Sequence, residues 1–129
     1  MTIRYLNKDY AVAPQVLPSD VAHLKEKGFA TLVCNRPDGE GGDQPSFAEI
    51  AAEAQKHGMQ ALHLPVIPGK ITPADRDAFA ALYAAAPKPV LGFCRTGMRA
   101  ETLWNATQDR LQGESGTFGN GFEGRGAQL

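Results

Sequence analysis

The chain of 129 residues has 43% hydrophobic and 21% charged residues and a formal net charge of −1. This length suits one domain with one hydrophobic core, and the near-neutral charge argues against nucleic acid as a partner, because proteins that bind nucleic acid usually carry a basic excess. No apolar stretch is long enough to cross a membrane, and the polar N-terminal residues are unlike a signal peptide. Two cysteines without an export signal favour a cytoplasmic protein with free thiols. The three histidines show no ligand spacing, so neither a metal nor another cofactor is expected.

Helix and strand signals alternate in the first half of the chain. Ser19 is an N-cap candidate, and Gly28 is a candidate helix stop. Ser46 and Glu49 have the spacing of a capping box. The sequence predicts a helix over 19–28, a strand over 29–34, a turn-rich loop over 35–44, a helix over 46–57 and a strand over 61–66. Residues 3–12 are expected to add an antiparallel piece to the sheet.

The second half continues this alternation. Thr72 followed by Pro73 is typical of a helix start, and Pro87 ends that helix. The sequence predicts a turn over 67–70, a helix over 72–86, a strand over 90–93 and a last helix that begins inside or directly after residues 94–99. Residues 1–112 are therefore assigned to one domain, and the Gly-rich residues 113–129 to a flexible or loosely packed tail.

This order of elements predicts an α/β fold, with a mainly parallel sheet and helices on both faces. In such folds the sites lie at the carboxyl ends of the strands. Cys94 follows the last predicted strand, and the loop 35–44 follows the strand over 29–34. Both segments are therefore expected at this edge of the sheet.

The segment 94–99, with the sequence Cys-Arg-Thr-Gly-Met-Arg, has the composition of an anion cradle. A strand, a glycine-containing turn and a helix aim backbone N–H groups and the positive helix end at a ligand. That field favours the thiolate of Cys94, which we expect to be the nucleophile. Arg99 is the second expected catalytic residue, because a guanidinium can donate two parallel hydrogen bonds to an anion. The expected anion-binding residues are Arg95, Thr96, Gly97 and Met98.

Two details of this segment have alternative interpretations. Gly97 is expected to let the backbone approach the bound anion closely. Cys94 could instead be a buried structural cysteine at a strand end, although two arginines and a glycine around it favour catalysis.

These residues belong to a wider pattern. The chain resembles the phosphatase-like domain of the bacterial beta-lactamase hydrolase-like proteins, which is related in fold to the dual-specificity phosphatases. The matching segments lie within about residues 10–105 and are Gln15 with Pro18-Ser19-Asp20, Gly28-Phe29, Asn35-Arg36-Pro37-Asp38-Gly39-Glu40, Gln44-Pro45-Ser46, Leu64-Pro65-Val66, Ile71-Thr72-Pro73 and Cys94-Arg95-Thr96-Gly97-Met98-Arg99 with Leu103-Trp104. Phe93 stands where relatives commonly have a histidine before the nucleophile.

The spacing within this loop bears on the reaction. Four residues separate Cys94 from Arg99, one fewer than in protein tyrosine phosphatases, so the loop resembles that of rhodanese-type sulfurtransferases. Dual-specificity phosphatases carry an Asp as general acid in the loop that corresponds to residues 67–70, where this chain has no carboxylate. The first expectation is therefore a sulfurtransferase that acts on thiosulfate or a persulfide through a Cys94 persulfide. The alternative is a phosphatase, a hydrolase of phosphate monoesters that works through a cysteinyl-phosphate.

The loop 35–44 offers support residues for either reaction. Arg36 is a candidate to pair with substrate, and Asp38 or Glu40 is a candidate to hold Arg99. Asp38, Glu40 and Asp43 are also candidate proton donors for a phosphatase. An equally weighted alternative is that these residues only hold the loop in place through its own turns and surface ion pairs.

Cys34 is interpreted as a packing residue, with a resolving thiol for a Cys94 persulfide as the alternative. A non-catalytic hypothesis also stands, in which the cradle binds an anion or senses sulfide through oxidation of Cys94. The expected partner in every case is a small anionic sulfur or phosphate compound, with the oligomeric state left open.

Overall fold

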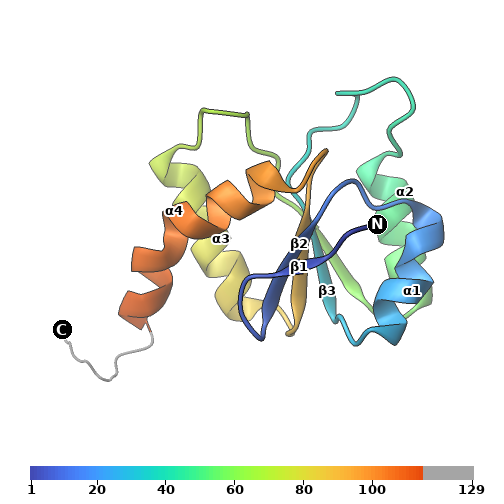
Figure 1. The fold of residues 1–129 in the computed structure, drawn as a ribbon, viewed down its shortest axis with the longest axis horizontal. Coiled ribbons are helices and arrows are strands. Elements are labelled where there is room, and N and C mark those ends of the chain that lie inside the picture. Colours follow the sequence, from blue (N-terminus) through green and yellow to red (C-terminus); the bar gives the residue numbers. More distant parts are fainter. Residues whose placement is uncertain (115–129) are drawn as a thin grey trace.

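The computed structural model describes residues 1–114, and within them the chain forms a five-stranded sheet (Figure 1). The strands are β1 (Arg4–Tyr5), β2 (Tyr10–Ala13), β3 (Thr31–Cys34), β4 (Gln60–His63) and β5 (Val90–Phe93). Their order in the sheet is β1-β2-β5-β3-β4. The pairs β2–β5, β5–β3 and β3–β4 are parallel, and the pair β1–β2 is antiparallel. The predicted α/β fold with a mainly parallel sheet is therefore confirmed.

The N-terminal region differs from the antiparallel addition predicted over residues 3–12. β1 is antiparallel to its neighbour, with Arg4 opposite Val12. β2 instead pairs in parallel with β5, with Tyr10 opposite Val90, and all four residues of β2 are buried. For β2 the prediction is wrong, because a continuously apolar strand needs cover on both faces and obtains it only inside the sheet.

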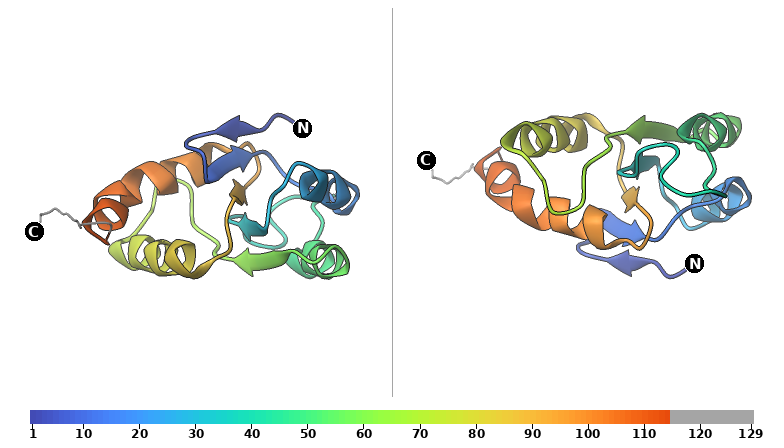
Figure 2. Two further views of the ribbon diagram at one scale, coloured as in Figure 1. Left: turned by 90° about the horizontal axis from the view of Figure 1, so that it is seen from below. Right: turned by 90° about the horizontal axis from the view of Figure 1, so that it is seen from above.

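Helices cover both faces of the sheet, as predicted (Figure 2). The helical elements are the 3₁₀ turn η1 (Pro18–Asp20), α1 (Val21–Glu26), α2 (Phe47–Lys56), α3 (Pro73–Ala85) and α4 (Met98–Glu114). α1 and α2 pack on one face through side chains such as Leu24 and Ile50. α3 and α4 pack on the other face through Phe79 and Leu103. Each face therefore has its own buried apolar layer.

The predicted helix starts are partly confirmed. Ser46 accepts a hydrogen bond from the backbone N–H of Glu49, and Thr72 makes the same contact with Asp75, so both capping boxes form. Ser19 is not an N-cap, because it lies inside the 3₁₀ turn η1, which comes before α1. Asp20 closes that turn instead, since its carboxylate accepts a hydrogen bond from the N–H of Leu17 at 2.9 Å.

Two strands are shorter than predicted, for local reasons. β3 begins at Thr31 because Gly28, with φ 96°, turns the chain and the N–H of Phe29 still bonds to α1. β4 ends at His63 because Pro65 has no N–H to donate to the sheet. The N–H of Val66 nevertheless donates to the carbonyl of Asn35 at 3.1 Å, so the chain stays beside the end of β3.

The last helix bears on both the site and the domain limit. α4 begins at Met98, inside the segment 94–99, and continues to Glu114, past the predicted limit at residue 112. The rest of the predicted Gly-rich tail, residues 115–129, lies outside the described residues. No helix within residues 1–114 combines the length and apolar character that crossing a bilayer requires.

An aromatic cluster fixes α4, and with it the segment 94–99, against the sheet. The ring of Tyr10 stacks on Trp104 with centroids 4.4 Å apart, and it meets Phe79 and Tyr83 edge-on. The hydroxyl of Tyr10 occupies the space that a side chain at position 92 would need. Position 92 therefore requires a glycine, because the side chain of Tyr10 lies directly over its backbone.

Candidate active site

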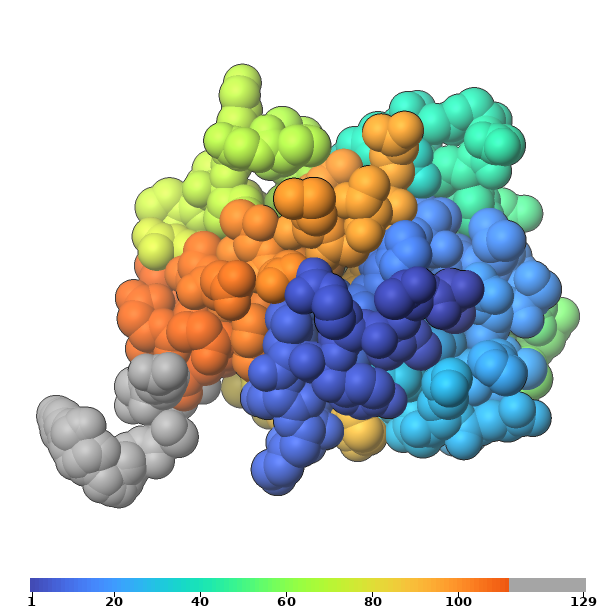
Figure 3. Space-filling view, in the orientation of Figure 1, coloured from blue at the N-terminus to red at the C-terminus, as the bar shows by residue number. Residues whose placement is uncertain are grey.

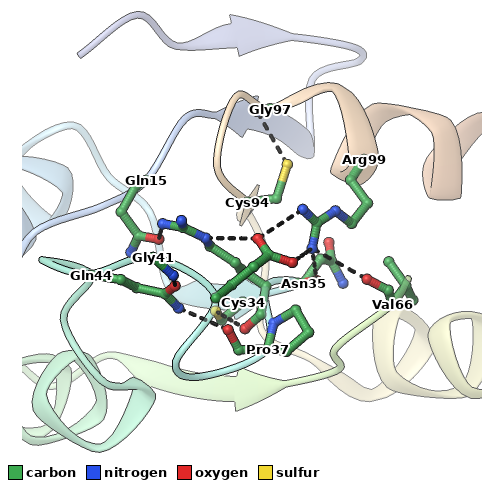
Figure 4. Close-up of polar contacts among 12 residues, drawn as sticks. Gln15, Cys34, Asn35, Pro37, Gly41, Gln44, Val66, Cys94, Gly97 and Arg99 are labelled. Carbon is green, nitrogen blue, oxygen red and sulfur yellow. Dashed lines mark hydrogen bonds and ion pairs between the residues drawn. The ribbon is translucent and has the colours of Figure 1, made fainter. Parts of the chain in front are cut away.

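Cys94 lies at the carboxyl end of β5, at the start of a tight loop that leads into α4 (Figure 4). The residue is 1% exposed and is a free cysteine. The backbone N–H of Gly97 donates to its Sγ atom at 3.1 Å. An inward-pointing N–H at the start of a helix stabilises negative charge on the sulfur, which is the form that attacks an electrophile.

The conformation of the loop depends on Gly97 and on its contact with the end of β2. Gly97 has φ 94°, a left-handed conformation that favours glycine. A Cβ at this position would lie 3.3 Å from the carbonyl oxygen of Ala13. The N–H of Gln15 also donates to the carbonyl of Arg95 at 3.3 Å. Gly97 is therefore required by the turn and by packing on Ala13, and close approach of an anion stays a prediction for it.

The side chain of Arg99 extends from the first turn of α4 and reaches Glu40. Its Nη2 donates to Glu40 Oε1 at 3.0 Å and its Nη1 to Oε2 at 3.2 Å, which makes a two-pronged ion pair. Nη1 also lies 3.2 Å from the carbonyl oxygen of Val66. The side chain of Arg99 is 10% exposed, and its guanidinium thus has a fixed orientation in the lining of the cleft that contains Cys94.

Glu40 belongs to a chain of polar contacts that extends away from Cys94. Arg36 Nε donates to Glu40 Oε1 at 3.0 Å, and Arg36 Nη1 donates to Gln15 Oε1 at 3.0 Å. Hydrogen bonds from Arg99, ahead of those from Arg36, hold the pKa of Glu40 below its usual range. The order Gln15–Arg36–Glu40–Arg99 therefore connects two loops to α4, and its carboxylate between two arginines is charged at neutral pH.

Arg36 and Asp38, the other candidate support residues of the loop 35–44, both make contacts that the sequence did not indicate. The side chain of Arg36 is 8% exposed and pairs with Glu40 and Gln15, so it supports the loop. Asp38 accepts a hydrogen bond from the N–H of Phe47 at 2.8 Å and thereby fixes the start of α2. Of the two candidates to hold Arg99, Glu40 makes the contact.

Cys34 lies on the opposite face of the sheet from Cys94. Its side chain belongs to the apolar layer under α1 and α2, whereas that of Cys94 belongs to the layer under α3 and α4. Cys34 Sγ donates to the carbonyl of Arg36 at 3.4 Å, and burial raises the pKa of its thiol to about 11. A protonated thiol on the other face is poorly placed to attack a sulfur held by Cys94, so this geometry favours packing as the role of Cys34.

A cleft of about 290 Å³ opens in front of Cys94. Its lining residues are Pro68, Gly69, Ile71, Cys94, Arg95, Thr96, Met98, Arg99 and Thr102. Arg95 is exposed there, and the N–H of Met98 donates to Thr96 Oγ1 at 3.3 Å. The part of this lining that the structure describes has no carboxylate. Glu40 is in the adjoining hollow, and its lowered pKa makes it a poor proton donor at neutral pH.

Three supporting contacts of this site were not anticipated from the sequence as functional features. They are the side chain of Gln15, the carbonyl group of Val66 and the hydroxyl of Tyr10 above Gly92. Gln15 and Val66 both belong to segments that match the phosphatase-like family, which gave a signal of their importance but not of these contacts. The backbone carbonyl of Val66 and the packing of Tyr10 have no signature in residue type.

Glu40→Gln is expected to lower the free energy of unfolding at neutral pH and to have little effect in acid. Because the folded-state pKa of Glu40 is lowered, its ion pairs stabilise the fold above the unfolded-state pKa of about 4.3. That contribution is lost as the pH falls through the lower, folded-state value. Urea unfolding of both proteins at pH 7 and at about pH 3 checks this. An equal difference at both pH values would contradict the assignment of the ion pair as the cause.

Comparisons with known proteins agree with each other on the fold and on the family of this chain. The family model described as "Beta-lactamase hydrolase-like protein, phosphatase-like domain" matches residues 2–110. The beta-lactamase hydrolase-like protein of Agrobacterium fabrum is 35% identical over 110 residues, which cover 83% of this chain and 26% of that protein. The corresponding protein of Xylella fastidiosa is 32% identical over 104 residues, 81% of this chain and 24% of that protein. The chain thus spans about a quarter of the length of these relatives.

Solved structures resemble the chain over most of its length. A protein of Neisseria meningitidis described as a "putative phosphatase" superimposes with a TM-score of 0.77 and 34% identity, over 90% of this chain and 80% of that one. A Shewanella putrefaciens protein with the same description gives a TM-score of 0.73 at 19% identity, over 91% of this chain and 73% of that one. The active form of Tk-PTP gives 0.56 at 16% identity, over 83% and 80%. The last two comparisons concern the fold alone.

Proposed function

Because this chain belongs to the family of phosphatase-like domains of beta-lactamase hydrolase-like proteins, we propose that it hydrolyses phosphate monoesters through a phosphorylated Cys94. The observation that carries the proposal is the position of the Cys94 sulfur. It lies at the start of a loop with the composition of an anion-binding site. It accepts a hydrogen bond from the N–H of Gly97 and is next to a cleft lined by Arg95 and Arg99. A nucleophile and donors for the transferred group thus converge on one small space.

The proposed reaction has two displacements at phosphorus. The Cys94 thiolate forms a bond to phosphorus while the bond from phosphorus to the ester oxygen breaks, and the departing oxygen takes a proton from solvent. Water then forms a bond to phosphorus and the S–P bond breaks, which releases orthophosphate and a proton and restores the thiolate. Loop N–H groups, Arg95 and Arg99 stabilise the charge on the phosphoryl oxygens in both steps.

The absence of a carboxylate from the described lining of the cleft limits the substrate. Without a protein group to protonate the departing oxygen, esters of acidic alcohols react fastest, because their oxygen leaves readily as an anion. The proposed substrate class is therefore the aryl phosphates, which include phosphotyrosine, rather than the alkyl phosphates. The exposed side chain of Met98 and the partly buried Ile71 offer apolar contact to an aromatic ring.

Sulfur transfer remains a second candidate, and one observation favours it. Four residues between Cys94 and Arg99 make a loop one residue shorter than that of protein tyrosine phosphatases. A smaller ring suits a terminal sulfur, and sulfur transfer needs no general acid. The family and its structural neighbours favour phosphate chemistry, so this reaction, the first expectation from the sequence, takes second place.

Kinetics on both substrate classes with one preparation test the choice. We expect hydrolysis of aryl phosphates whose kcat/KM falls steeply as the departing phenol becomes less acidic, and no formation of thiocyanate from thiosulfate and cyanide. Intact mass after incubation with thiosulfate provides an independent measurement. One added sulfur atom on Cys94, together with thiocyanate formation and no release of phosphate, would overturn the proposal in favour of sulfur transfer. Anion binding without either reaction would favour the non-catalytic hypothesis.

A further inference from the structure

The cleft in front of Cys94 continues into a second hollow between α3 and α4. This hollow of about 340 Å³ is lined by Gly69, Ile71, Arg76, Thr102 and Ala106. Gly69, Ile71 and Thr102 line the cleft of Cys94 as well, so the two spaces form one groove. Figure 3 shows the connection between β4 and α3, in yellow-green, standing above the orange surface of α4.

Arg76 is the charged residue of the second hollow. It is partly buried in the second turn of α3, and its Nη1 lies 3.5 Å from the backbone carbonyl oxygen of Ala106 on α4. At that distance the hydrogen bond is weak, so the guanidinium has donors to offer to a ligand. Its long side chain lies across the gap between the two helices and presents positive charge to the groove.

No described carboxylate lies in the second hollow to neutralise Arg76. The two acidic residues adjacent to it in sequence have other partners: Asp75 caps the start of α3, and Asp77 pairs with Arg110. Along the groove and the hollow that adjoins it at Glu40, the charged lining residues are Arg36, Glu40, Arg76, Arg95 and Arg99. Because Glu40 is the one carboxylate in that described lining, the groove is cationic on a chain whose net charge is −1.

We propose that the second hollow is a subsite for a second anionic group of the substrate, bound by Arg76 while the phosphate is next to Cys94. This inference rests on the proposed function and extends it to a substrate class. Ile71 lies between the two cationic ends, so an apolar or aromatic connection between the two anions fits the groove. The substrate is then an aryl phosphate that carries a carboxylate or a second phosphate beyond its ring.

Binding of analogues that cannot be hydrolysed tests the subsite without depending on turnover. The probes are short peptides with phosphonomethyl-phenylalanine in place of phosphotyrosine, with Glu or Gln at each flanking position, and a small aromatic ring with two phosphonomethyl groups. Calorimetry with the wild-type protein gives the ratio of Kd for each probe without the second anionic group, namely the Gln peptide or the ring with one phosphonomethyl group, to Kd for its counterpart with that group. We expect one anionic probe to bind about tenfold more tightly, as one charge-assisted hydrogen bond predicts.

Variants of Arg76 and Arg110 show which residue causes the tighter binding of the probe with a second anionic group. Arg76→Gln should bring the ratio close to one, while Arg76→Lys should retain part of it. Arg110→Gln is the matched control, because Arg110 pairs with Asp77 and is absent from the groove lining, and it should keep the wild-type ratio. Preference for the Glu peptide indicates a peptide substrate, and preference for the double phosphonate a small molecule.

The result that would overturn the subsite is a ratio near one in the wild-type protein, or a ratio that Arg76→Gln leaves unchanged. The proposed function fails separately, if aryl phosphates are bound but never hydrolysed.

Discussion

Cys94→Ser is expected to reduce the hydrolysis of aryl phosphates by about 10³-fold or more, with an unchanged fold. In the proposed reaction the sulfur of Cys94 forms the covalent intermediate, and a serine hydroxyl at this site has no neighbouring base to activate it among the described lining residues. Because the two side chains have nearly the same shape, the N–H of Gly97 keeps an acceptor. Initial rates with an activated aryl phosphate, together with circular dichroism and thermal unfolding, measure both halves of the prediction.

The chain supplies a matched control for this variant. Cys34 is also buried at the carboxyl end of a parallel strand, but on the other face of the sheet, and its raised pKa of about 11 keeps it a thiol. Cys34→Ser retains a donor for the carbonyl of Arg36 and should keep kcat/KM within about twofold of wild type. Activity that survives in Cys94→Ser, or that disappears in Cys34→Ser at unchanged stability, would contradict the assignment of the nucleophile.

Arg99→Lys is expected to lower kcat/KM by about 10²-fold, although the positive charge is kept. The guanidinium of Arg99 has two Nη atoms on the carboxylate of Glu40 and further contact to the carbonyl of Val66. A lysine ammonium is a point donor and cannot reproduce this planar arrangement. Steady-state kinetics with an aryl phosphate check the size of the effect, and inhibition by orthophosphate reports whether anion affinity falls with it.

Comparison with Glu40→Gln separates two roles of Arg99. If Arg99 only connects the segment 94–99 to Glu40, Arg99→Lys and Glu40→Gln lose the same activity. The double variant then loses no more than either single variant. If Arg99 also holds the transferred phosphoryl group, Arg99→Lys loses more than Glu40→Gln, and the excess is seen in kcat. Arg110→Lys is the control for a general effect of replacing arginine on α4, since Arg110 pairs with Asp77 on the surface. Unchanged kinetics in Arg99→Lys would restrict Arg99 to a structural role.

The family and the candidate nucleophile could be inferred from the sequence because each inference depends on residues that are adjacent in the chain. A strand, a cysteine, a left-handed glycine and a helix start all lie within about ten residues, so their geometry follows from local backbone rules. The capping boxes at Ser46 and Thr72 were predictable for the same reason. The alternation of helices and strands then determined a parallel sheet, because parallel strands need crossover helices.

Only the tertiary structure decided what the remaining charged residues do. Gln15, the neighbours Arg36 and Glu40, and Arg99 come from three distant parts of the chain and meet only after β2, β3 and β5 have paired. Burial then assigned Arg36 to the support of Glu40, which its residue type alone left open. Strand register likewise placed Cys34 and Cys94 on opposite faces of the sheet.

The groove that reaches Arg76 is the clearest case of this difference. It exists because α3 and α4 pack side by side beneath the connection that follows β4, and no pattern within any one of these segments indicates it. Local hydrogen bonds and backbone preferences act over a few residues, so the sequence by itself determined the elements and the nucleophilic loop. Contacts between distant residues depend on which surfaces the elements bury, so partners, exposure and the shape of the cleft were decided by the packing of the fold.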